Sequence, residues 1–147
     1  MKIKEVSLDS LKEAAELFNE YRKFYGKEND LLGAETFLKE RIENGESIIF
    51  LAYEQEQAVG FVQIYPIFSS ISMKRAYILN DLFVEPSYRG GGVGKAILNR
   101  VFNLCEENGG SYVTLQTSPD NHRAKGLYEH MGMSLDSEYD WYIKYSK

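Results

Sequence analysis

The sequence predicts a single α/β or α+β sandwich built on one mixed, mostly antiparallel, twisted sheet. Three observations lead to this expectation: helical and strand-like periodicities are both present, strand-like segments follow one another in the middle of the chain, and amphipathic helices precede and follow them. A doubly wound parallel sheet does not fit, because it needs strand and helix to alternate throughout. We expect about seven strands and four helices in the order βααβββαβαββ.

One strand and two helices are expected in the first part of the chain. The strand covers Lys2–Val6, after which Asp9 or Ser10 can cap a helix that carries apolar residues on one face. Gly26 is expected to end this helix. A second helix is expected over Gly33–Asn44 and is followed directly by a glycine.

The middle of the chain predicts consecutive strands. Ser47–Tyr53 and Ala58–Tyr65 are apolar segments on the two sides of a polar turn, so we expect a hairpin that ends before Pro66. A third strand is expected over Arg75–Val84. Residues 85–88 then form a turn into a glycine-rich segment.

The last part of the chain is expected to add two helices and three strands. Apolar side chains recur every four residues in the first of these helices, at Val93, Ile97, Val101 and Cys105. Tyr112–Thr117 predicts a strand, and a final helix capped by Asp120 or Asn121 should close at Gly132. Two short strands are expected within Met133–Tyr145.

Composition and charge exclude several classes of function. The 147 residues suit one domain over 1–147, with 44% apolar and 27% charged residues. A net charge of -5 argues against a nucleic-acid surface, and no apolar run is long enough to span a membrane. The N-terminus lacks a signal core, and the single Cys105 permits no internal disulfide. We therefore expect a cytoplasmic protein, and no metal, because no His-Cys cluster has ligand spacing.

A glycine-rich segment joins the predicted third strand to the next helix. Its residues are Arg89, Gly90, Gly91, Gly92, Val93, Gly94 and Lys95. Backbone N–H groups at a helix start lack internal partners and lie at the positive end of the helix dipole, so this junction predicts phosphate binding. A Walker A loop is excluded because Ala96 has no hydroxyl, and the glycine spacing of a dinucleotide fingerprint is not met.

The remaining pattern, Arg-x-x-Gly-x-Gly, resembles the pyrophosphate loop of the GCN5-related N-acetyltransferases (GNAT). A second motif supports the resemblance: Asn121 and Ala124 match the family's Asn-x-x-Ala, and Leu127-Tyr128 and Gly132 match the Leu-Tyr and Gly that follow. The likeness is sharp over residues 77–133. It implies the GNAT fold and the transfer of an acetyl group from acetyl-CoA to an amine.

The resemblance also implies roles for particular residues. Backbone groups of Leu82, Phe83 and Val84 would pair with the pantetheine arm and direct an N–H at the thioester oxygen, while the glycine loop holds the pyrophosphate. Asn121 would bond a pantetheine amide. Tyr128 would donate its hydroxyl proton to the departing thiolate, as general acid.

Candidate residues for the acceptor amine lie in the third predicted strand and in aromatic positions. Asp81 could steer a cationic amine or accept its proton through water, and a structural, hydrogen-bonded carboxylate is the alternative. Strand alternation predicts that Asn80 and Asp81 face opposite sides. Tyr21, Tyr25 and Trp141 could line a site for a cation, although core packing explains such residues equally well.

Within the family, the chain resembles the diamine and related small-amine acetyltransferases. Diamine enzymes carry an acidic residue where this chain has Asn80, so the chain lacks a negative charge that would hold a second ammonium group. The candidate acceptors are therefore amino acids, simple amines and aminoglycoside-like amines as well as polyamines. The resemblance further implies a homodimer and direct attack in a ternary complex. Two other functions stay open: a protein or peptide N-acetyltransferase, and a coenzyme A sensor without catalysis.

Overall fold

The computed structural model of the protein describes residues 1–146. Its packing divides the chain into two compact units, Met1–Gln116 and Thr117–Lys147. The first unit holds the sheet and three α-helices, and the second holds one α-helix and the C-terminal segment. The expectation of a single domain over 1–147 stays a prediction.

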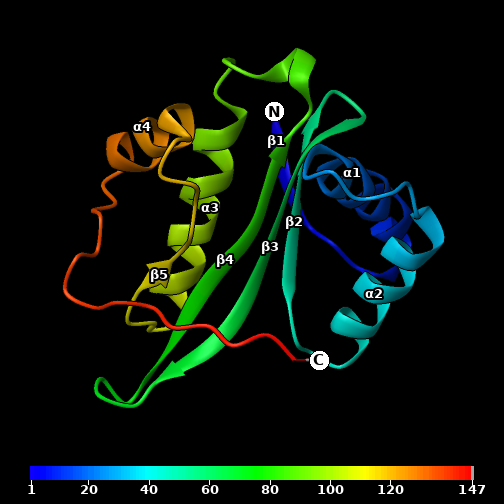
Figure 1. The fold of residues 1–147 in the computed structure, drawn as a ribbon. Coiled ribbons are helices and arrows are strands. Elements are labelled where there is room, and N and C mark those ends of the chain that lie inside the picture. Colours follow the sequence, from blue (N-terminus) through cyan, green and yellow to red (C-terminus); the bar gives the residue numbers. More distant parts are fainter. Residues whose placement is uncertain (147) are drawn as a thin grey trace. The chain divides into compact units, whose positions relative to one another are not determined.

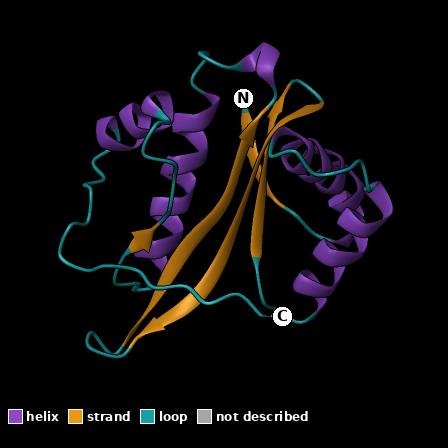
Figure 2. Ribbon diagram, in the orientation of Figure 1, coloured by secondary structure: helices purple, strands orange, loops and turns teal. Residues whose placement is uncertain are grey.

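A mixed sheet forms the centre of the first unit, with strand order β1-β2-β3-β4-β5. Neighbouring strands run antiparallel except β4 and β5, which are parallel. The sheet is therefore mixed and mostly antiparallel, as predicted. Figure 2 shows the twist of the long strands. The strands are β1 (Lys2–Glu5), β2 (Ile48–Glu54), β3 (Gln57–Ser69), β4 (Lys74–Val84) and β5 (Val113–Thr114).

Helices cover both faces of this sheet, with α1 and α2 on one face and α3 on the other (Figure 1). Two neighbouring residues of β3 show the division. Phe61 packs on α1, where its ring centroid lies 5.7 Å from that of Phe18, whereas Gly60 faces α3 and abuts Val93 and Ile97. The helices are α1 (Leu11–Phe24), α2 (Leu31–Glu43), α3 (Val93–Glu107) and, in the second unit, α4 (His122–His130).

Most helix ends follow the predicted local signals. α1 is followed by Gly26 at φ +83°, and the Gly26 and Lys27 N–H groups bond the last-turn carbonyls of Lys23 and Arg22. α4 begins at Asn121, whose side-chain oxygen accepts from the Ala124 N–H at 3.2 Å. Gly and Asn provide these ends because their backbone and side chain satisfy groups that the helix leaves unbonded.

β3 continues through Pro66 to Ser69, although a strand end before this proline was expected. The register explains the difference. β2 begins opposite Ile64, so at Pro66 the strand has a partner on the β4 side only. A proline is tolerated where its nitrogen has no ladder hydrogen bond to donate.

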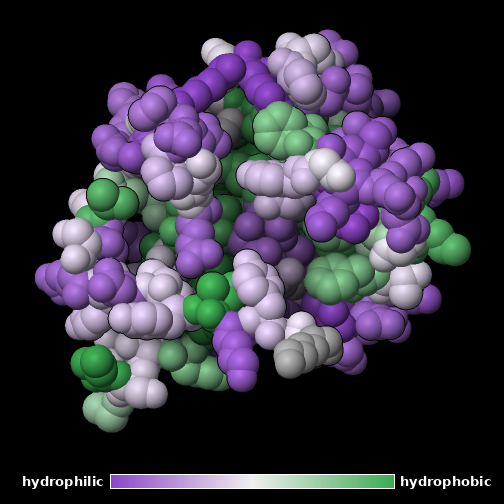
Figure 3. Space-filling model, viewed as in Figure 1, coloured by the Kyte–Doolittle hydropathy of each residue, from purple (hydrophilic) through white to green (hydrophobic). Residues whose placement is uncertain are grey.

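The tip of the β3–β4 hairpin is apolar and exposed. Phe68, Ile71 and Met73 are 75%, 95% and 89% exposed, and apolar surface is visible at the lower left of the molecule (Figure 3). The Arg75 guanidinium lies 5.1 Å from the Phe68 ring centroid. The tip is held by the β3–β4 ladder and by Ser111, whose Oγ donates to Ser72 Oγ at 3.0 Å and whose N–H donates to the Arg75 carbonyl at 2.7 Å.

The two strands expected within Met133–Tyr145 are not formed, and the described residues give five strands instead of about seven. Large apolar side chains of this segment are exposed, including Trp141 at 73% and Tyr142 at 94%. A strand needs a hydrogen-bonded neighbour, and side-chain pattern carries no information on whether one is present.

Gly60 sets the close approach of α3 to the sheet, and we expect Gly60→Ala to destabilise the protein by about 1 kcal/mol. A Cβ at this position would lie 2.9 Å from both Val93 Cγ1 and Ile97 Cδ1. Gly126→Ala in α4 is the matched control, because a Cβ there meets nothing within 4 Å, and it should stabilise by roughly 0.5–1 kcal/mol. Thermal unfolding measures both, and equal shifts would contradict the packing argument.

Candidate active site

The edge of β4 toward β5 is open over its second half. β5 pairs with β4 only as far as Ile78, which lies opposite Thr114, whereas β4 stays paired with β3 up to Val84. Residues 79–84 therefore have a strand neighbour on one side only. This open stretch includes Leu82–Val84, the residues whose backbone was expected to bind the pantetheine arm, and it leaves backbone groups without a ladder partner on the β5 side.

Alternation along the β3–β4 ladder identifies which groups face the open edge. The Glu85 N–H donates to the Val59 carbonyl at 2.9 Å. In an antiparallel ladder the N–H and C=O of every second residue face the same neighbour, so Phe83 and Asp81, like Glu85, turn both groups toward β3. Phe83 then turns its N–H toward β3, whereas Leu82 and Val84 turn theirs toward the open edge. The backbone of Phe83 is therefore used in the β3–β4 ladder, which leaves Leu82 and Val84 as the residues that can pair with a pantetheine arm.

Arg89 ties the end of β4 to α1. Its Nε donates to the Val84 carbonyl at 2.8 Å, and its guanidinium lies 5.6 Å from the ring centroids of both Phe24 and Phe83. The positive charge of Arg89 is therefore held beside the start of the glycine loop by one hydrogen bond and two aromatic rings. Arg89 uses the Val84 carbonyl, which is the last one that faces the open edge. The Val84 N–H is therefore the backbone group of this residue that is left for a ligand.

The glycine loop presents a run of backbone N–H groups. The first N–H at the start of α3 to find a backbone acceptor is that of Ala96, which bonds the Gly92 carbonyl at 3.1 Å. Across residues 1–146, the N–H groups of residues 90–95 have no hydrogen-bond partner. Gly90 and Gly92 adopt φ of +85° and +89°, a conformation that favours glycine. The loop can therefore accept an anion with its backbone.

A β-bulge places Asp81 in a polar cluster on the α1/α2 face. Gln63 lies opposite Asp81 but Ile64 lies opposite Leu79, so Asn80 is an extra residue in β4. Asp81 is only 6% exposed, and its carboxylate accepts from Gln63 Nε2 at 2.8 Å. Asn80 Nδ2 donates to both carboxylate oxygens at 3.2 Å. The expectation that Asn80 and Asp81 face opposite sides was wrong, because the bulge breaks strand alternation.

Sequence reasoning missed two members of this cluster, Gln63 and Tyr65. Both follow Phe61 at alternate positions of β3, so all three face α1 and α2. Burial raises the pKa of the Tyr65 phenol to about 12, and the negative charge of Asp81 adds to the rise. The missed signal was a glutamine inside an otherwise apolar strand, since a buried amide needs a polar partner.

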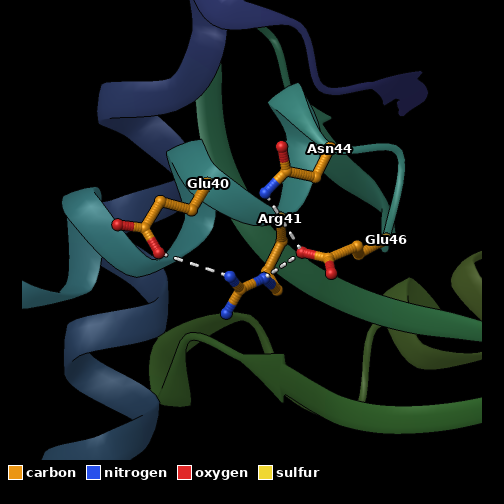
Figure 4. A network of polar contacts seen from close by, with 4 residues as sticks. All are labelled: Glu40, Arg41, Asn44 and Glu46. Atoms are coloured by element: carbon orange, nitrogen blue, oxygen red, sulfur yellow. Dashed lines mark hydrogen bonds and ion pairs between the residues drawn. The ribbon is translucent and has the colours of Figure 1, made fainter.

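Arg41 of α2 opposes the effect of Asp81 on Tyr65, because its positive charge lowers the pKa of that phenol. Figure 4 shows that Arg41 is itself paired, with Nε donating to Glu46 at 2.9 Å and Nη2 lying 3.3 Å from Glu40. Asn44 Nδ2 also reaches Glu46, at 3.5 Å. Two carboxylates therefore offset the charge of Arg41. Because its pKa is raised to about 12, the Tyr65 phenol is neutral at physiological pH.

Aromatic side chains of α1 lie beside the C-terminal half of β4. The ring of Tyr21 lies 6.4 Å from that of Phe83 and 5.0 Å from that of Tyr25, centroid to centroid. The structure therefore brings the predicted Tyr21 and Tyr25 together, with Phe24 next to Tyr25 at 5.4 Å. Trp141 belongs to the second unit, and its role in an aromatic lining stays a prediction.

The second unit carries Asn121 and Tyr128 on one side of α4, because seven positions are close to two helical turns. The Asn121 Oδ1 caps the helix, so its Nδ2 is the atom with which it could donate to a ligand. Tyr128 is half-buried. Their predicted roles toward the donor substrate stay predictions.

The chemistry of Cys105, possible metal ligands and possible membrane helices were also compared with the expectations from the sequence. Burial raises the pKa of the Cys105 thiol, and the charge of Glu106 adds to the rise, which agrees with an inert thiol. Residues 1–146 contain no group of three or more His, Cys, Asp or Glu side chains arranged to hold a metal ion. Within the same range, every helix is too short or too polar to cross a lipid bilayer.

Several known proteins that are similar to this chain are named as acetyltransferases. The profile of the Acetyltransferase (GNAT) family matches residues 14–133. Uncharacterized N-acetyltransferase YhfO of Bacillus subtilis is 46% identical over 142 residues, which span 97% of this chain and 95% of that protein. The crystal structure of a probable acetyltransferase matches with a TM-score of 0.95 at 35% identity, over 100% of this chain and 99% of its own.

A more distant match shows the fold alone. An aminoglycoside acetyltransferase from an uncultured soil metagenomic sample has a TM-score of 0.86 at 18% identity, over 99% of this chain and 96% of its own. The α/β fold with a mixed sheet is therefore shared well beyond proteins of closely similar sequence.

The raised pKa of Tyr65 predicts a loss of stability in alkali. Its folded pKa of about 12 exceeds the ordinary value of about 10, so its contribution is complete below pH 10 and disappears as the pH rises toward 12. We expect urea denaturation of Tyr65→Phe to show a smaller loss between pH 9 and pH 11 than the wild type. Part of the loss will remain, because burial and Glu13 also raise the pKa of Tyr53 to about 12.

Tyr142→Phe is the control for this measurement, since Tyr142 is 94% exposed. It should follow the wild-type profile. An identical profile for Tyr65→Phe would show that the Tyr65 phenol ionises in the folded protein as easily as in water.

Proposed function

The chain belongs to the Acetyltransferase (GNAT) family, and from this premise we propose that it transfers the acetyl group of acetyl-CoA to a primary amine of a small molecule, by direct attack in a ternary complex. The family uses acetyl-CoA as its acetyl donor. The observation that carries the proposal is the continuity of the open β4 edge with the unbonded N–H groups of residues 90–95. The bond from Arg89 Nε to the Val84 carbonyl holds the start of the loop next to the end of the edge, which suits an extended substrate that ends in a pyrophosphate.

The donor substrate would be held mainly by backbone groups. The N–H groups of residues 90–95 would bind the pyrophosphate at the positive end of α3, with the exposed Lys95 beside them. The outward-facing groups of Leu82 and Val84 would pair with the pantetheine arm, and Asn121 Nδ2 would donate to one of its amides. Arg89 would act by holding the end of β4 in place.

The transfer needs one bond formed, one bond broken and two protons removed from nitrogen. Asp81 takes the first proton from the ammonium, directly or through water, and the free amine bonds to the acetyl carbon. The carbon–sulfur bond breaks as Tyr128 gives its proton to the sulfur, and the second proton that nitrogen loses on becoming an amide restores the Tyr128 phenol through water. The N–H of Leu82 or Val84 would stabilise the oxyanion. Asp81, Leu82 and Val84 all belong to β4, and a group held in a strand needs little reorientation to act.

The acceptor is proposed to carry a single ammonium group near the reacting centre. One buried carboxylate, that of Asp81, lies in the cluster, and its neighbour Asn80 is neutral. Tyr21 and Tyr25 supply aromatic faces that favour a cation. Simple amines and amino acids therefore fit better than polyamines. The cytoplasmic location and the homodimer belong to the same proposal, and light scattering that finds a monomer would remove the second.

Calorimetry with coenzyme A tests the donor site. We expect uptake by the wild type and an affinity about tenfold lower for Arg89→Lys, because lysine cannot keep both the Nε bond to Val84 and the stacking on Phe24. Arg75→Lys is the matched control: Arg75 also lies over an aromatic ring, but at the start of β4, at the far end of that strand from the loop. A wild type without uptake would refute the proposed function.

Tyr128→Phe tests the general acid. We expect turnover to fall by about 10²–10⁴-fold while coenzyme A affinity is retained, because only the phenolic proton is removed. Thiol release over a library of primary amines measures turnover, and Tyr145→Phe, at an 80% exposed tyrosine, is the control. Undiminished turnover would show that another group protonates the sulfur. Coenzyme A uptake without turnover of any amine or peptide would favour a sensor.

A further inference from the structure

Gln63 is the most deeply buried polar side chain of the polar cluster, with 0% exposure. Its Nε2 donates to Asp81 Oδ2 at 2.8 Å. Its Oε1 is buried and has no hydrogen-bond partner in the part of the chain that the structure describes. Leaving a buried amide oxygen unsatisfied is costly, and natural proteins rarely do so without a reason.

The orientation of this amide follows from its partner. An ionised carboxylate can only accept hydrogen bonds, so Gln63 must present its nitrogen to Asp81 and keep its oxygen on the other side. The amide oxygen and nitrogen are within about 2.3 Å of each other by covalent geometry, so Oε1 lies at most roughly 5 Å from Asp81 Oδ2. One donor atom can therefore hydrogen-bond to both oxygens.

The two oxygens together call for a donor with more than one hydrogen and a positive charge. Oε1 and the Asp81 carboxylate both accept, and both lie on the face that Tyr21 and Phe83 line with aromatic rings. Exposed Asn80 contacts both oxygens of the carboxylate, so the cluster is one side chain away from solvent. An alkylammonium group matches these demands better than a neutral or anionic group.

We infer that Gln63 is a specificity-determining residue that selects primary amines, by accepting one N–H of the acceptor through Oε1 while Asp81 pairs with its charge. The inference rests on the proposed function. A primary amine keeps an N–H for Oε1 after it loses a proton and also in the amide product. A secondary amine has none left in the product, and a hydroxyl must give up its only hydrogen.

Two measurements test this role, with Gln63→Met against Gln57→Met, a control at an exposed glutamine of the same strand. In the first, propylammonium should raise the melting temperature of the wild type more than trimethylpropylammonium does at equal ionic strength. Gln63→Met should lose this difference and Gln57→Met should keep it. The wild-type comparison needs no variant, and equal stabilisation by the two salts would overturn the inference.

In the second measurement, thiol release from acetyl-CoA is followed with primary amines and their N-methyl counterparts. We expect the wild type to prefer the primary amine by at least about tenfold in kcat/KM, and Gln63→Met to bring the ratio close to one. If Gln63→Met keeps the wild-type ratio while turnover and coenzyme A uptake persist, the role of Gln63 fails and the proposed function stands. If coenzyme A uptake is absent, the proposed function fails and Gln63 selects no acceptor, while the melting comparison still shows whether Gln63 binds a primary ammonium group.

Discussion

The end of pairing between β4 and β5 at Ile78 is the constraint on which the candidate site depends. Beyond it, β4 is held by β3 alone, and Leu82 and Val84 turn backbone groups to an open edge. Open strand edges are a liability in proteins. Here the Arg89 side chain occupies the end of the edge, and the glycine loop continues it with further unbonded N–H groups. A bound substrate would supply the hydrogen bonds that a longer β5 would otherwise make.

The extra residue at Asn80 is a second constraint, acting across the same strand. Tyr77 bonds Asn108 at the end of α3, so in regular alternation Asp81 would face α3 as well. The bulge turns Asp81 to the α1/α2 face, where Gln63 and the aromatic rings of α1 lie. In the proposed function, β4 would offer its edge to the acetyl donor and its face to the acceptor amine. This arrangement fits the proposed direct transfer, because two substrates can meet at one strand without sharing a binding surface.

Much of the candidate site was predictable from local sequence, and the failures have one kind of cause. The glycine loop, the Asn121 cap and the apolar face of α3 depend on residues within a few positions of one another, and the structure contains all three. Asn80 and Asp81 do not face opposite sides, and the two strands expected within Met133–Tyr145 are not formed. The backbone of Phe83 turns to β3 and not to the open edge. Each of these depends on how a strand pairs with a distant one, and Gln63 was missed because its partner is 18 residues away.

By itself the sequence determined the helices, their ends and an anion-binding loop, since these follow from side-chain periodicity, from caps and from the N–H groups that a helix start leaves unbonded. The family resemblance also came from such local motifs, and the comparisons confirmed it. The tertiary structure alone decided which β4 groups stay unpaired, which face Asp81 occupies and that the side-chain oxygen of Gln63 is buried without a partner among the described residues. Pairing register and burial are properties of segments far apart in the chain, so no local pattern can encode them.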